Sequence, residues 1–405
     1  MNQNLIKNWQ TKKLGEVCDF LSGLWKGKIP PYIKVGVIRN TNITKDGKLD
    51  DTNIAYLYVE KKQFENRKLL YGDIILEKSG GGPKQPVGRV IIFNKREEEF
   101  SFSNFTTAIR IKNKKVLDFN FLHKFLFLSY ISGITESMQS HSTGIRNLDS
   151  KSYKNIEIPL PPFGEQLRIV KILDKVFGEI ERIKKNTEKN LQNAKDLFES
   201  YLRSIFTNSG WAEKTLKEIS IEFSRGKSKH RPRNDKKLYG GKYPFIQTGD
   251  IRNSDHFINK YSQTYNEVGL KQSKLWPKGT ICITIAANIA ETGLLNFSSC
   301  FPDSVIGLIV DPKKANEEFV EYLLFFFKTK IKSKGKGSAQ ANINMGTFEY
   351  EKFPIPNLLT QKSIIKKLDL LSEKTKRLEE IYKQKLVDLE ELKKTILKQA
   401  FEGKL

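Results

Sequence analysis

The chain has 405 residues, too many for a single small domain, so two to four domains are expected. It carries 70 lysines and arginines against 46 aspartates and glutamates, a formal net charge of +24. Such an excess of positive charge favours a polyanionic partner, with nucleic acid first and an anionic membrane surface second.

The remaining composition argues against a secreted or membrane protein. The first residues lack the apolar core of a signal peptide, and the longest wholly apolar run, 322–327, is far too short to span a bilayer. Cys18, Cys282 and Cys300 are odd in number and lack metal-ligand spacing. We therefore expect a cytoplasmic protein with reduced thiols and no membrane segment.

Residues 1–161 are predicted to form a compact domain. Short strands are expected at 35–40, 72–76 and 87–93, and a short apolar helix at 122–130. Polar or glycine-containing loops separate them, at 22–27, 78–84 and 142–147. Short strands mixed with few helices predict an α+β fold.

Residues 162–208 are predicted to form a long helix that starts after a proline-rich turn. Proline at 159, 161 and 162 excludes a helix before Phe163, and no proline follows for more than forty residues. The expected seam, spaced by four and three, is Ile169, Leu173, Val176, Ile180, Ile183, Thr187, Asn190, Ala194, Leu197 and Tyr201. A second row is Val170, Phe177, Leu191, Phe198 and Ile205, interrupted by Lys184. Such a helix requires a partner helix.

The second half of the chain repeats this order, with a domain at 209–356 and a second long helix at 357–405. Trp211 precedes 216–219 as Trp9 precedes 14–17, and Gln361 follows Gln166 by 195 residues. The seam expected in the second helix is Ile364, Leu368, Leu371, Thr375, Leu378, Tyr382, Leu389, Leu392 and Ile396. The scaffold repeats while the loops differ, which predicts two related domains with unlike ligands.

Basic residues gather in the loops, where they are candidates for DNA contact. The run 225–237 holds seven lysines and arginines against Asp235 alone. A merely solvated loop is the other interpretation of each run, but clustering at similar places in both halves favours phosphate contact. The candidates are Lys26, Lys28, Arg39, Lys78, Lys84, Arg89, Thr143, Arg146, Arg225, Lys227, Lys229, Arg231, Arg233, Lys334, Lys336, Gln340 and Asn342. Among these, Arg39, Arg146, Gln340 and Asn342 have side chains suited to reading base edges.

Segments that imitate catalytic motifs lack the residues that chemistry would need. The segments 29–32 and 160–163 look like the Asn-Pro-Pro-Tyr/Phe loop of adenine methyltransferases, but an aliphatic residue replaces the asparagine and no glycine-rich cofactor motif accompanies them. The segment 226–228 lacks the earlier glycine of a phosphate-binding loop, because position 221 is isoleucine. The four histidines show no metal or nucleophile spacing. We expect no catalytic residues, bound cofactor or metal.

Two basic domains alternating with two similar long helices resemble the specificity subunit of a Type I restriction–modification system. The stretch 158–166, IPLPPFGEQ, and the C-terminal 398–405, KQAFEGKL, carry this resemblance, whereas 355–361 lacks the double proline and the glutamate. The resemblance implies two target-recognition domains that each read half of a split site in double-stranded DNA. It also implies that the helices pair as an antiparallel coiled coil, which acts as a spacer and docks two methyltransferase subunits.

In that family, other subunits supply the chemistry. Methyltransferase subunits would bind S-adenosylmethionine, and motor–nuclease subunits would use ATP and Mg²⁺, so this chain itself would bind no cofactor. Two other interpretations remain open. One is a DNA-binding coiled-coil architectural or adaptor protein without a methyltransferase partner, and the other is a one-chain methyltransferase or nuclease. The bases recognised cannot be read from the sequence, because readout also depends on side-chain placement and DNA deformation.

Overall fold

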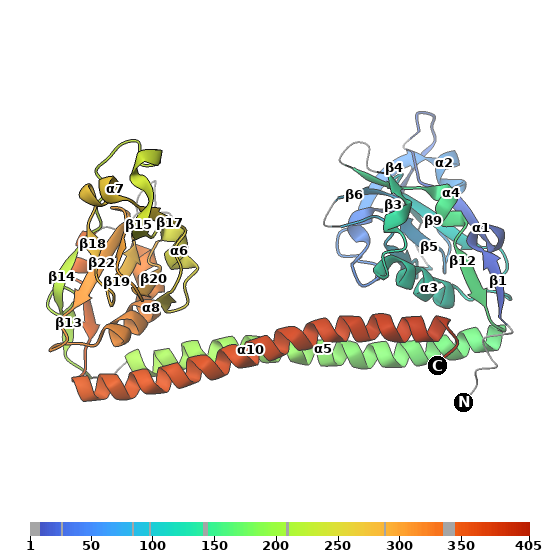
Figure 1. Ribbon diagram of the computed structural model, residues 1–405. Helices are drawn as coiled ribbons and strands as arrows, with labels where there is room; N and C mark the ends of the chain where they lie inside the picture. The colour runs from blue at the N-terminus through green and yellow to red at the C-terminus, as the bar shows by residue number, and fades with distance from the viewer. Residues whose placement is uncertain are drawn as a thin grey trace. The chain divides into compact units, whose positions relative to one another are not determined.

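The computed structural model describes residues 9–25, 27–82, 85–96, 99–140, 145–207, 210–286, 289–334 and 345–405. The chain divides into two compact units. Unit 1 comprises Met1–Glu188 and Gln384–Leu405, and unit 2 comprises Lys189–Lys383. Each unit therefore contains one globular domain and part of each of two long helices (Figure 1). Within the described ranges, none of the helices is both long and apolar enough to cross a membrane.

The domain of unit 1 is built on two small sheets. A four-stranded antiparallel sheet has the order β2-β9-β5-β7, and a three-stranded sheet has the order β4-β3-β8. These strands are β2 (Cys18–Ser22), β3 (Tyr32–Ile38), β4 (Ala55–Glu60), β5 (Ile74–Glu77), β7 (Val90–Ile92), β8 (Phe100–Phe102) and β9 (Thr106–Ile111). All four residues of β5 are buried, as an inner strand between two layers requires.

The remaining elements of this domain close the core and form its loops. They are β1 (Gln10–Lys13), α1 (Leu14–Val17), α2 (Lys61–Glu65), β6 (Ser79–Gly81), α3 (Phe119–Ile131), β10 (Gln139–Ser140), β11 (Arg146–Leu148), α4 (Ser150–Lys154) and β12 (Glu157–Leu160). Helix α3 packs its apolar face on the four-stranded sheet, with Phe121, Leu122 and Leu126 in the core. The segment 78–84, predicted as a loop, contains strand β6, which pairs with β11.

The domain of unit 2 repeats this plan with different lengths. A five-stranded sheet has the order β14-β22-β19-β20-β16, and a four-stranded sheet has the order β17-β15-β21-β18. The strands are β14 (Ser220–Arg225), β15 (Tyr239–Phe245), β16 (Phe257–Ile258), β17 (Gln263–Tyr265), β18 (Leu275–Trp276), β19 (Ile281–Thr284), β20 (Thr292–Leu295), β21 (Ser299–Cys300) and β22 (Val305–Val310). The other elements are β13 (Glu213–Thr215), α6 (Thr248–Arg252), α7 (Glu267–Lys271), α8 (Glu317–Lys334), α9 (Met345–Glu349) and β23 (Lys352–Pro354).

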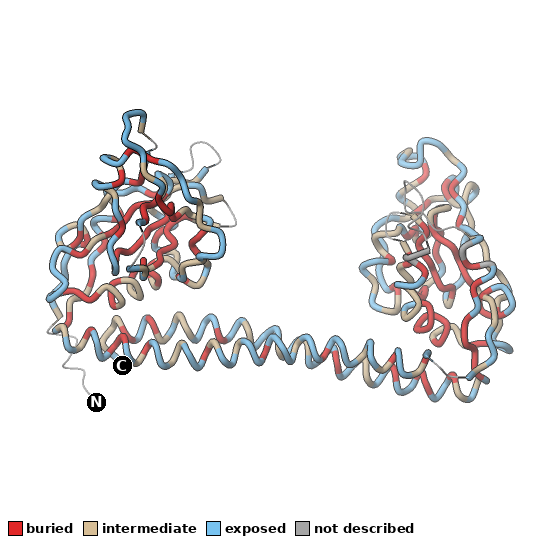
Figure 2. The backbone as a smooth tube through the Cα atoms, turned by 180° about the vertical axis from the view of Figure 1, so that it is seen from behind, coloured by how far each residue is buried: buried red, intermediate tan, exposed pale blue. Residues whose placement is uncertain are grey.

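The two long helices are α5 (Phe163–Phe206) and α10 (Leu358–Phe401), each of 44 residues. They run antiparallel, as Figures 1 and 2 show from opposite sides. In unit 1 the start of α5, at Ile169 and Leu173, shares a core with Leu397 of α10. In unit 2 the end of α5, at Leu202, shares a core with Leu368. The predicted α+β class with two similar domains and an antiparallel helix pair is confirmed.

The seam between the helices differs in part from the predicted one. Ile169, Leu173, Ile180, Thr187 and Ala194 are buried as expected. The second predicted row flanks them: Val170 is buried, and Phe177, Lys184, Leu191, Phe198 and Ile205 are half-buried. Lys184, which interrupts that row, donates from Nζ to Oε1 of Glu390 on α10 at 2.7 Å. A charged pair therefore replaces an apolar contact there.

The seam prediction is wrong for Ile183, Asn190 and Leu197 on α5, and for Leu378 and Leu392 on α10, all of which are exposed. On a helix of 3.6 residues per turn, a spacing of four and three fits neighbouring rows almost equally well. Leu202 and Phe206, which the prediction left out, are buried instead.

A buried glutamine fastens each long helix to the domain that precedes it. The side chain of Gln166 accepts from the backbone N–H of Asp118 at 2.9 Å and donates to the carbonyl oxygens of Val116 and Pro161, each at 2.9 Å. Gln361 accepts from the N–H of Asn316 at 2.8 Å and donates to the carbonyl oxygen of Pro356 at 2.7 Å. Both glutamines are fully buried.

The residue that donates its N–H in this contact is also a helix cap. The carboxylate of Asp118 accepts from the N–H groups of Asn120 and Phe121 at the start of α3, and the amide oxygen of Asn316 accepts from Glu318 and Phe319 at the start of α8. The sequence repeat is therefore a repeat of hydrogen bonds.

Candidate nucleic-acid interface

In unit 1, three segments that are far apart in the sequence meet around strand β6. The Ser79 hydroxyl donates to Oδ1 of Asn147 at 2.5 Å, and the N–H of Leu148 donates to the carbonyl oxygen of Lys78 at 2.8 Å. Gly80 has φ +100°, and a Cβ there would lie 2.8 Å from Nδ2 of Asn40. Only glycine combines this backbone conformation with such a close approach.

This convergence brings together three of the predicted DNA contacts of unit 1. Lys78 precedes β6, Arg146 begins β11, and Arg39 precedes Asn40. All three side chains are half-buried. Arg39 donates from Nη2 to the carbonyl oxygen of Asn53 at 3.2 Å, and its N–H donates to Oδ1 of Asn42 at 3.0 Å. These contacts fix the backbone of the loop that presents Arg39.

The prediction that Arg89 contacts DNA is wrong. Arg89 is buried, and its guanidinium forms two bonds to the buried carboxylate of Glu77, at 2.7 and 2.8 Å. It also donates to the carbonyl oxygens of Ile43 and Asn40. Its donors are thus used inside the domain, where they support the loop that carries Arg39.

In unit 2, some members of the basic run are held within their own loop and others are exposed. The Nη2 of Arg233 lies 2.6 and 2.8 Å from the two carboxylate oxygens of Asp303, and Arg231 lies 3.9 Å from the same group. The Nε of Arg225 donates to the backbone carbonyl oxygen of Asp303 at 2.7 Å. Lys227 and Lys229 are exposed. Part of the run therefore holds its own loop, and the two lysines present their charge to solvent.

A second acidic side chain also organises this loop. Asp235 accepts from the N–H of Lys237 at 3.1 Å and lies 2.9 Å from Nε2 of His230. These partners, the backbone N–H first and the imidazole next, lower the pKa of Asp235. Asp235 is therefore ionised around neutral pH and can accept from both partners.

A hollow of about 620 Å³ adjoins the basic run of unit 2. Its walls include Ser228, Arg233, Asn234, Lys236, Tyr239, Gln247, Thr248, Gln263, Tyr265 and Ser304. The Nε2 of Gln247 donates to Oε1 of Gln263 at 2.7 Å. Amide and guanidinium groups around one hollow can bind phosphates and the edges of bases.

Gln247 occupies the place that Arg39 holds in unit 1, and it was not among the predicted contacts. The N–H of Gln247 donates to Oδ2 of Asp250 at 2.8 Å, as that of Arg39 does to Asn42 three residues further on. Both residues follow the long strand of the smaller sheet, β15 or β3. The sequence 245–251, FIQTGDI, is similar to 38–43, IRNTNI, with Gln247 at the place of Arg39. This similarity could have identified Gln247.

The remaining candidates are not brought into either cluster. Lys28 is exposed in the loop before β3. Lys26, Lys84, Thr143, Lys336, Gln340 and Asn342 lie outside the described residues, as does the side chain of Lys334.

The three cysteines are buried. Burial raises the pKa of Cys18 to about 12 and that of Cys300 to about 11, and it raises the pKa of Cys282 as well. These thiols are therefore protonated at neutral pH and are poor nucleophiles.

Comparison with known proteins agrees with this architecture. A family model described as the Type I restriction modification DNA specificity domain matches residues 6–192 and again 208–387. The putative Type I restriction enzyme MjaX specificity subunit of Methanocaldococcus jannaschii is 23% identical, over 98% of this chain and 94% of that protein. The StySPI specificity subunit of Salmonella potsdam is 22% identical, over 99% of this chain and 90% of that protein.

Solved structures show the same fold. A chain from a study of complex assembly and conformational transition of the type I R-M system matches with a TM-score of 0.81 at 18% identity, over 98% of both chains. The HsdS subunit from Thermoanaerobacter tengcongensis matches with a TM-score of 0.63 at 18% identity, over 98% of this chain and 97% of that one. With two copies of the family's domain over most of its length, the chain belongs to the Type I restriction–modification DNA specificity family.

Proposed function

We propose that this chain recognises a bipartite, asymmetric site in double-stranded DNA and directs adenine methylation, and cleavage, by partner subunits. The domain of each unit would read one half of the site. The antiparallel helices would set the spacing between the halves and bind two methyltransferase subunits. Motor–nuclease subunits would join the full complex.

The observation that carries this proposal is a repeated scaffold with unlike reading groups. Gln166 and Gln361 make the same contact to Asp118 and Asn316. Arg39 in unit 1 and Gln247 in unit 2 occupy equivalent positions on this shared scaffold. Arginine favours guanine edges and glutamine favours adenine edges, so two such domains would prefer different half-sites.

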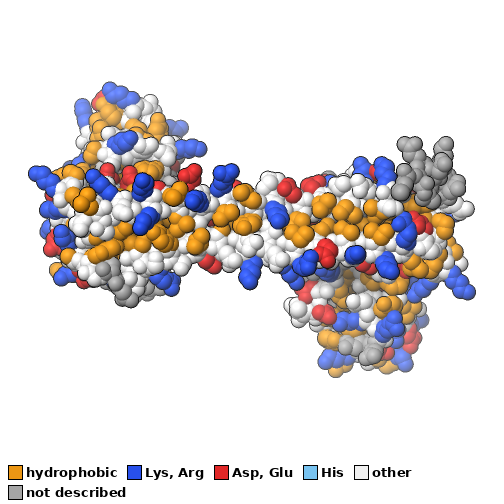
Figure 3. All heavy atoms as spheres, turned by 90° about the horizontal axis from the view of Figure 1, so that it is seen from below, with side chains coloured by type: hydrophobic (Ala, Val, Ile, Leu, Met, Phe, Trp, Pro, Cys, Tyr) orange, Lys and Arg blue, Asp and Glu red, His pale blue; other side chains and the backbone are white. Residues whose placement is uncertain are grey.

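Each unit has a pair of exposed apolar residues on its helices, Ile183 with Leu392 in unit 1 and Leu197 with Leu378 in unit 2. These pairs support docking of two copies of one partner. Ile183 and Leu378 are related by the repeat of 195 residues and are 37% and 38% exposed. Leu197 and Leu392 are related in the same way and are 49% and 45% exposed. Figure 3 shows hydrophobic side chains, in orange, open to solvent over the helices. Exposed apolar side chains at equivalent positions suit two identical partners.

The chain itself would be non-catalytic. S-adenosylmethionine would bind to the methyltransferase subunits, and ATP and Mg²⁺ to the motor–nuclease subunits. We expect the purified chain alone neither to methylate nor to cut DNA, as measured by methyl transfer from labelled S-adenosylmethionine. Transfer by the rigorously purified chain would contradict this assignment.

The docking surface is tested by counting methyltransferase subunits bound to the chain, using light scattering. Replacing Ile183 and Leu392 with serine should remove one copy, replacing Leu197 and Leu378 should remove the other, and the fourfold variant should bind none. Leu167→Ser is a matched control, because Leu167 is exposed on α5 but its repeat counterpart is Lys362. Two copies bound to a folded fourfold variant would contradict the proposed surface.

A further inference from the structure

An ion pair of unit 1 has a counterpart in unit 2 that lacks its cation. In unit 1, Nζ of Lys124 on α3 lies 2.5 Å from Oδ1 of Asp174 on α5. Counted from the helix caps Asp118 and Asn316, Tyr322 of α8 stands where Lys124 stands in α3. Asp369 of α10 follows Asp174 by the repeat of 195 residues. The hydroxyl of Tyr322 donates to Oδ1 of Asp369 at 2.7 Å. The aspartate is retained, and a neutral hydroxyl has replaced the ammonium group.

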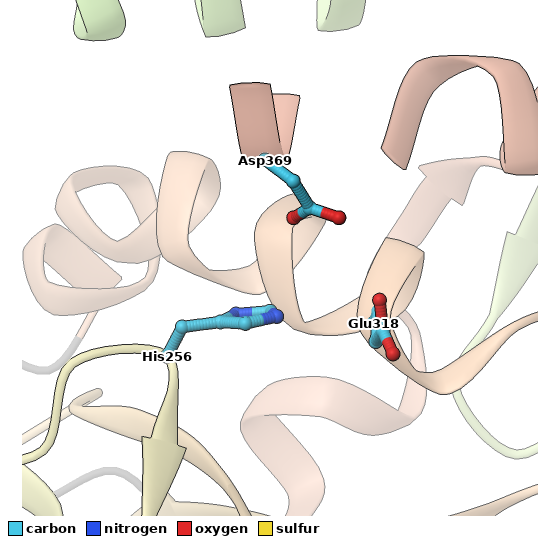
Figure 4. Close-up of side chains that lie close together, drawn as sticks. All are labelled: His256, Glu318 and Asp369. Atoms are coloured by element: carbon cyan, nitrogen blue, oxygen red, sulfur yellow. The ribbon is translucent and has the colours of Figure 1, made fainter. Parts of the chain in front are cut away.

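Asp369 lies beside a second carboxylate and a histidine. Glu318, in the first turn of α8, and His256, in the loop before β16, join Asp369 in a cluster. One ligand-type atom from each residue lies within 4.8 Å of the other two. Figure 4 shows the imidazole of His256 directed between the two carboxylates.

The imidazole of His256 is oriented as a metal ligand would be. Its Nδ1 is hydrogen-bonded to Oε2 of Glu321, whose other oxygen accepts from the Thr292 hydroxyl at 2.8 Å. Its ring stacks on Tyr322, with centroids 4.3 Å apart and planes at 14°. The His256 side chain is 11% exposed, and its Nε2 is a buried atom without a hydrogen-bond partner. A carboxylate on one ring nitrogen fixes the tautomer that leaves the other free for a metal.

Two lysines that line the hollow beside this cluster are paired with other carboxylates. A hollow of about 430 Å³, bordered by His256, Glu321 and Tyr322, is also lined by Lys328 and Lys376. Lys328 lies 2.5 Å from Glu291, and Lys376 lies 2.6 Å from Asp255. Neither ion pair includes Glu318, Glu321 or Asp369. Lys195 and Arg252 line the same hollow.

From these observations we propose that His256, Glu318 and Asp369 bind a divalent transition-metal ion, with Glu321 holding His256 in place. One nitrogen and two carboxylate ligands suit Zn²⁺, whose fourth position would be taken by water. Zn²⁺ at about 2.0–2.1 Å from each ligand needs the ligand atoms about 3.3 Å apart. Rotation of the Glu318 and Asp369 side chains can close the remaining distance, and Asp369 is exposed, which gives the ion access.

Such an ion would join three segments of unit 2: the loop before β16, the start of α8 and the long helix α10. It would take the place that the Lys124 ammonium holds in unit 1. It would thereby fasten the recognition domain of unit 2 to the part of α10 that belongs to unit 2. The sequence spacing of 256, 318 and 369 fits no metal motif, because each ligand comes from a different element. This inference is independent of which DNA the chain recognises.

The test is calorimetric titration of Zn²⁺ into the full chain after treatment with a chelator, with Co²⁺ absorption as a spectroscopic probe. We expect one Zn²⁺ per chain and a tetrahedral Co²⁺ spectrum. Asp369→Asn and Glu318→Gln should each weaken Zn²⁺ binding at least tenfold, and Glu321→Gln by about 10–100-fold. Asp174→Asn, the repeat counterpart in unit 1, is the matched control and should bind Zn²⁺ as the wild type does.

Thermal unfolding with and without Zn²⁺ distinguishes a variant that has lost Zn²⁺ binding from one that is only less stable. Zn²⁺ should raise the unfolding temperature of the wild type and of Asp174→Asn, but not that of Asp369→Asn, because only a ligand that binds the folded state stabilises it. The absence of stoichiometric Zn²⁺ binding by the wild type would overturn the proposal. Equal binding by folded Asp369→Asn and Glu318→Gln would overturn it as well.

Discussion

The backbone N–H of Asp118 donates a 2.9 Å hydrogen bond to the side chain of Gln166, 48 residues further along the chain. This contact joins the cap of α3 to the first turn of α5, and Asn316 and Gln361 repeat it in unit 2. It is the point at which each recognition domain is attached to a long helix.

Replacing Gln166 with alanine should therefore destabilise unit 1. The change leaves the N–H of Asp118 and the carbonyl oxygen of Val116 without their partner in a buried site, which costs about 1–3 kcal/mol for each group. Urea unfolding should show a loss of about 2–4 kcal/mol. Gln361→Ala should behave similarly in unit 2. Gln192→Ala, on the exposed face of α5, is the control and should cost less than about 0.5 kcal/mol. Equal losses for Gln166 and Gln192 would contradict this role.

The repeat was predictable from the sequence because its causes are local. Prolines before each helix, a glutamine at the same place and apolar spacing along the helix all act over short distances. The hydrogen-bond partner of that glutamine was not predictable, because Asp118 and Gln166 meet only after the sheet has formed.

The functions of the charged residues were harder to predict, because burial decides them. Arg89 looks in sequence like the other basic candidates, yet a buried Glu77 takes its guanidinium. Arg233 belongs to the predicted basic run, yet Asp303, 70 residues away, pairs with it. The apolar residues Ile183 and Leu197 fit a seam by spacing alone, and only the geometry of two packed helices shows that they face solvent.

The exposed lysines of unit 2 should contribute to DNA affinity without regard to sequence. Replacing Lys227 and Lys229 with glutamine should reduce the slope of log affinity against log salt concentration by about 1.8, since each lost phosphate contact removes about 0.9. Fluorescence anisotropy with duplex DNA over a range of salt concentrations measures this slope. Lys362 and Lys366, exposed on α10, provide a charge-matched double variant that should leave it unchanged. An unchanged slope for Lys227 and Lys229 would mean that their loop is only solvated.

Unit 1 should lose stability in mild acid because of His123. Its Nε2 lies 3.3 Å from the carbonyl oxygen of Val90, and its ring stacks against Phe127. Burial, reinforced by the nearby charge of Lys124, lowers the pKa of His123 to about 4 in the folded chain. The unfolded chain, with a pKa of about 6.5, binds the proton more readily. Stability is therefore complete above pH 6.5 and falls as the pH drops toward 4.

His123→Gln removes this titration, so its free energy of unfolding should change less with pH than that of the wild type. The difference between pH 7 and pH 5 should be about 1–2 kcal/mol. Chemical unfolding at a series of pH values measures it, and measurements at pH 8 provide the reference for the effect of the substitution itself. Identical pH profiles for both proteins would rule out His123 as the titrating group.

Lengthening both helices should lengthen the gap between the half-sites. A heptad inserted after Glu188 in α5 and after Lys383 in α10 preserves the seam and adds about 10 Å, or roughly three base pairs. Methylation of substrates with altered gaps measures the change, and the bases of each half-site should stay the same. A heptad in α5 alone disturbs the pairing and should abolish activity. If the lengthened, folded chain still prefers the original gap, the helices do not set the spacing.

The central claim is that two separate domains read two halves of one site, and methylation sequencing tests it most directly. DNA modified by the chain with its methyltransferase partner should show one asymmetric motif, in two specific parts separated by a fixed gap. Arg39→Ala should relax the preference in one part only, and Gln247→Ala in the other part only, each by about 1–3 kcal/mol of base discrimination. A continuous motif, or a loss of preference at the same bases in both variants, would contradict this account.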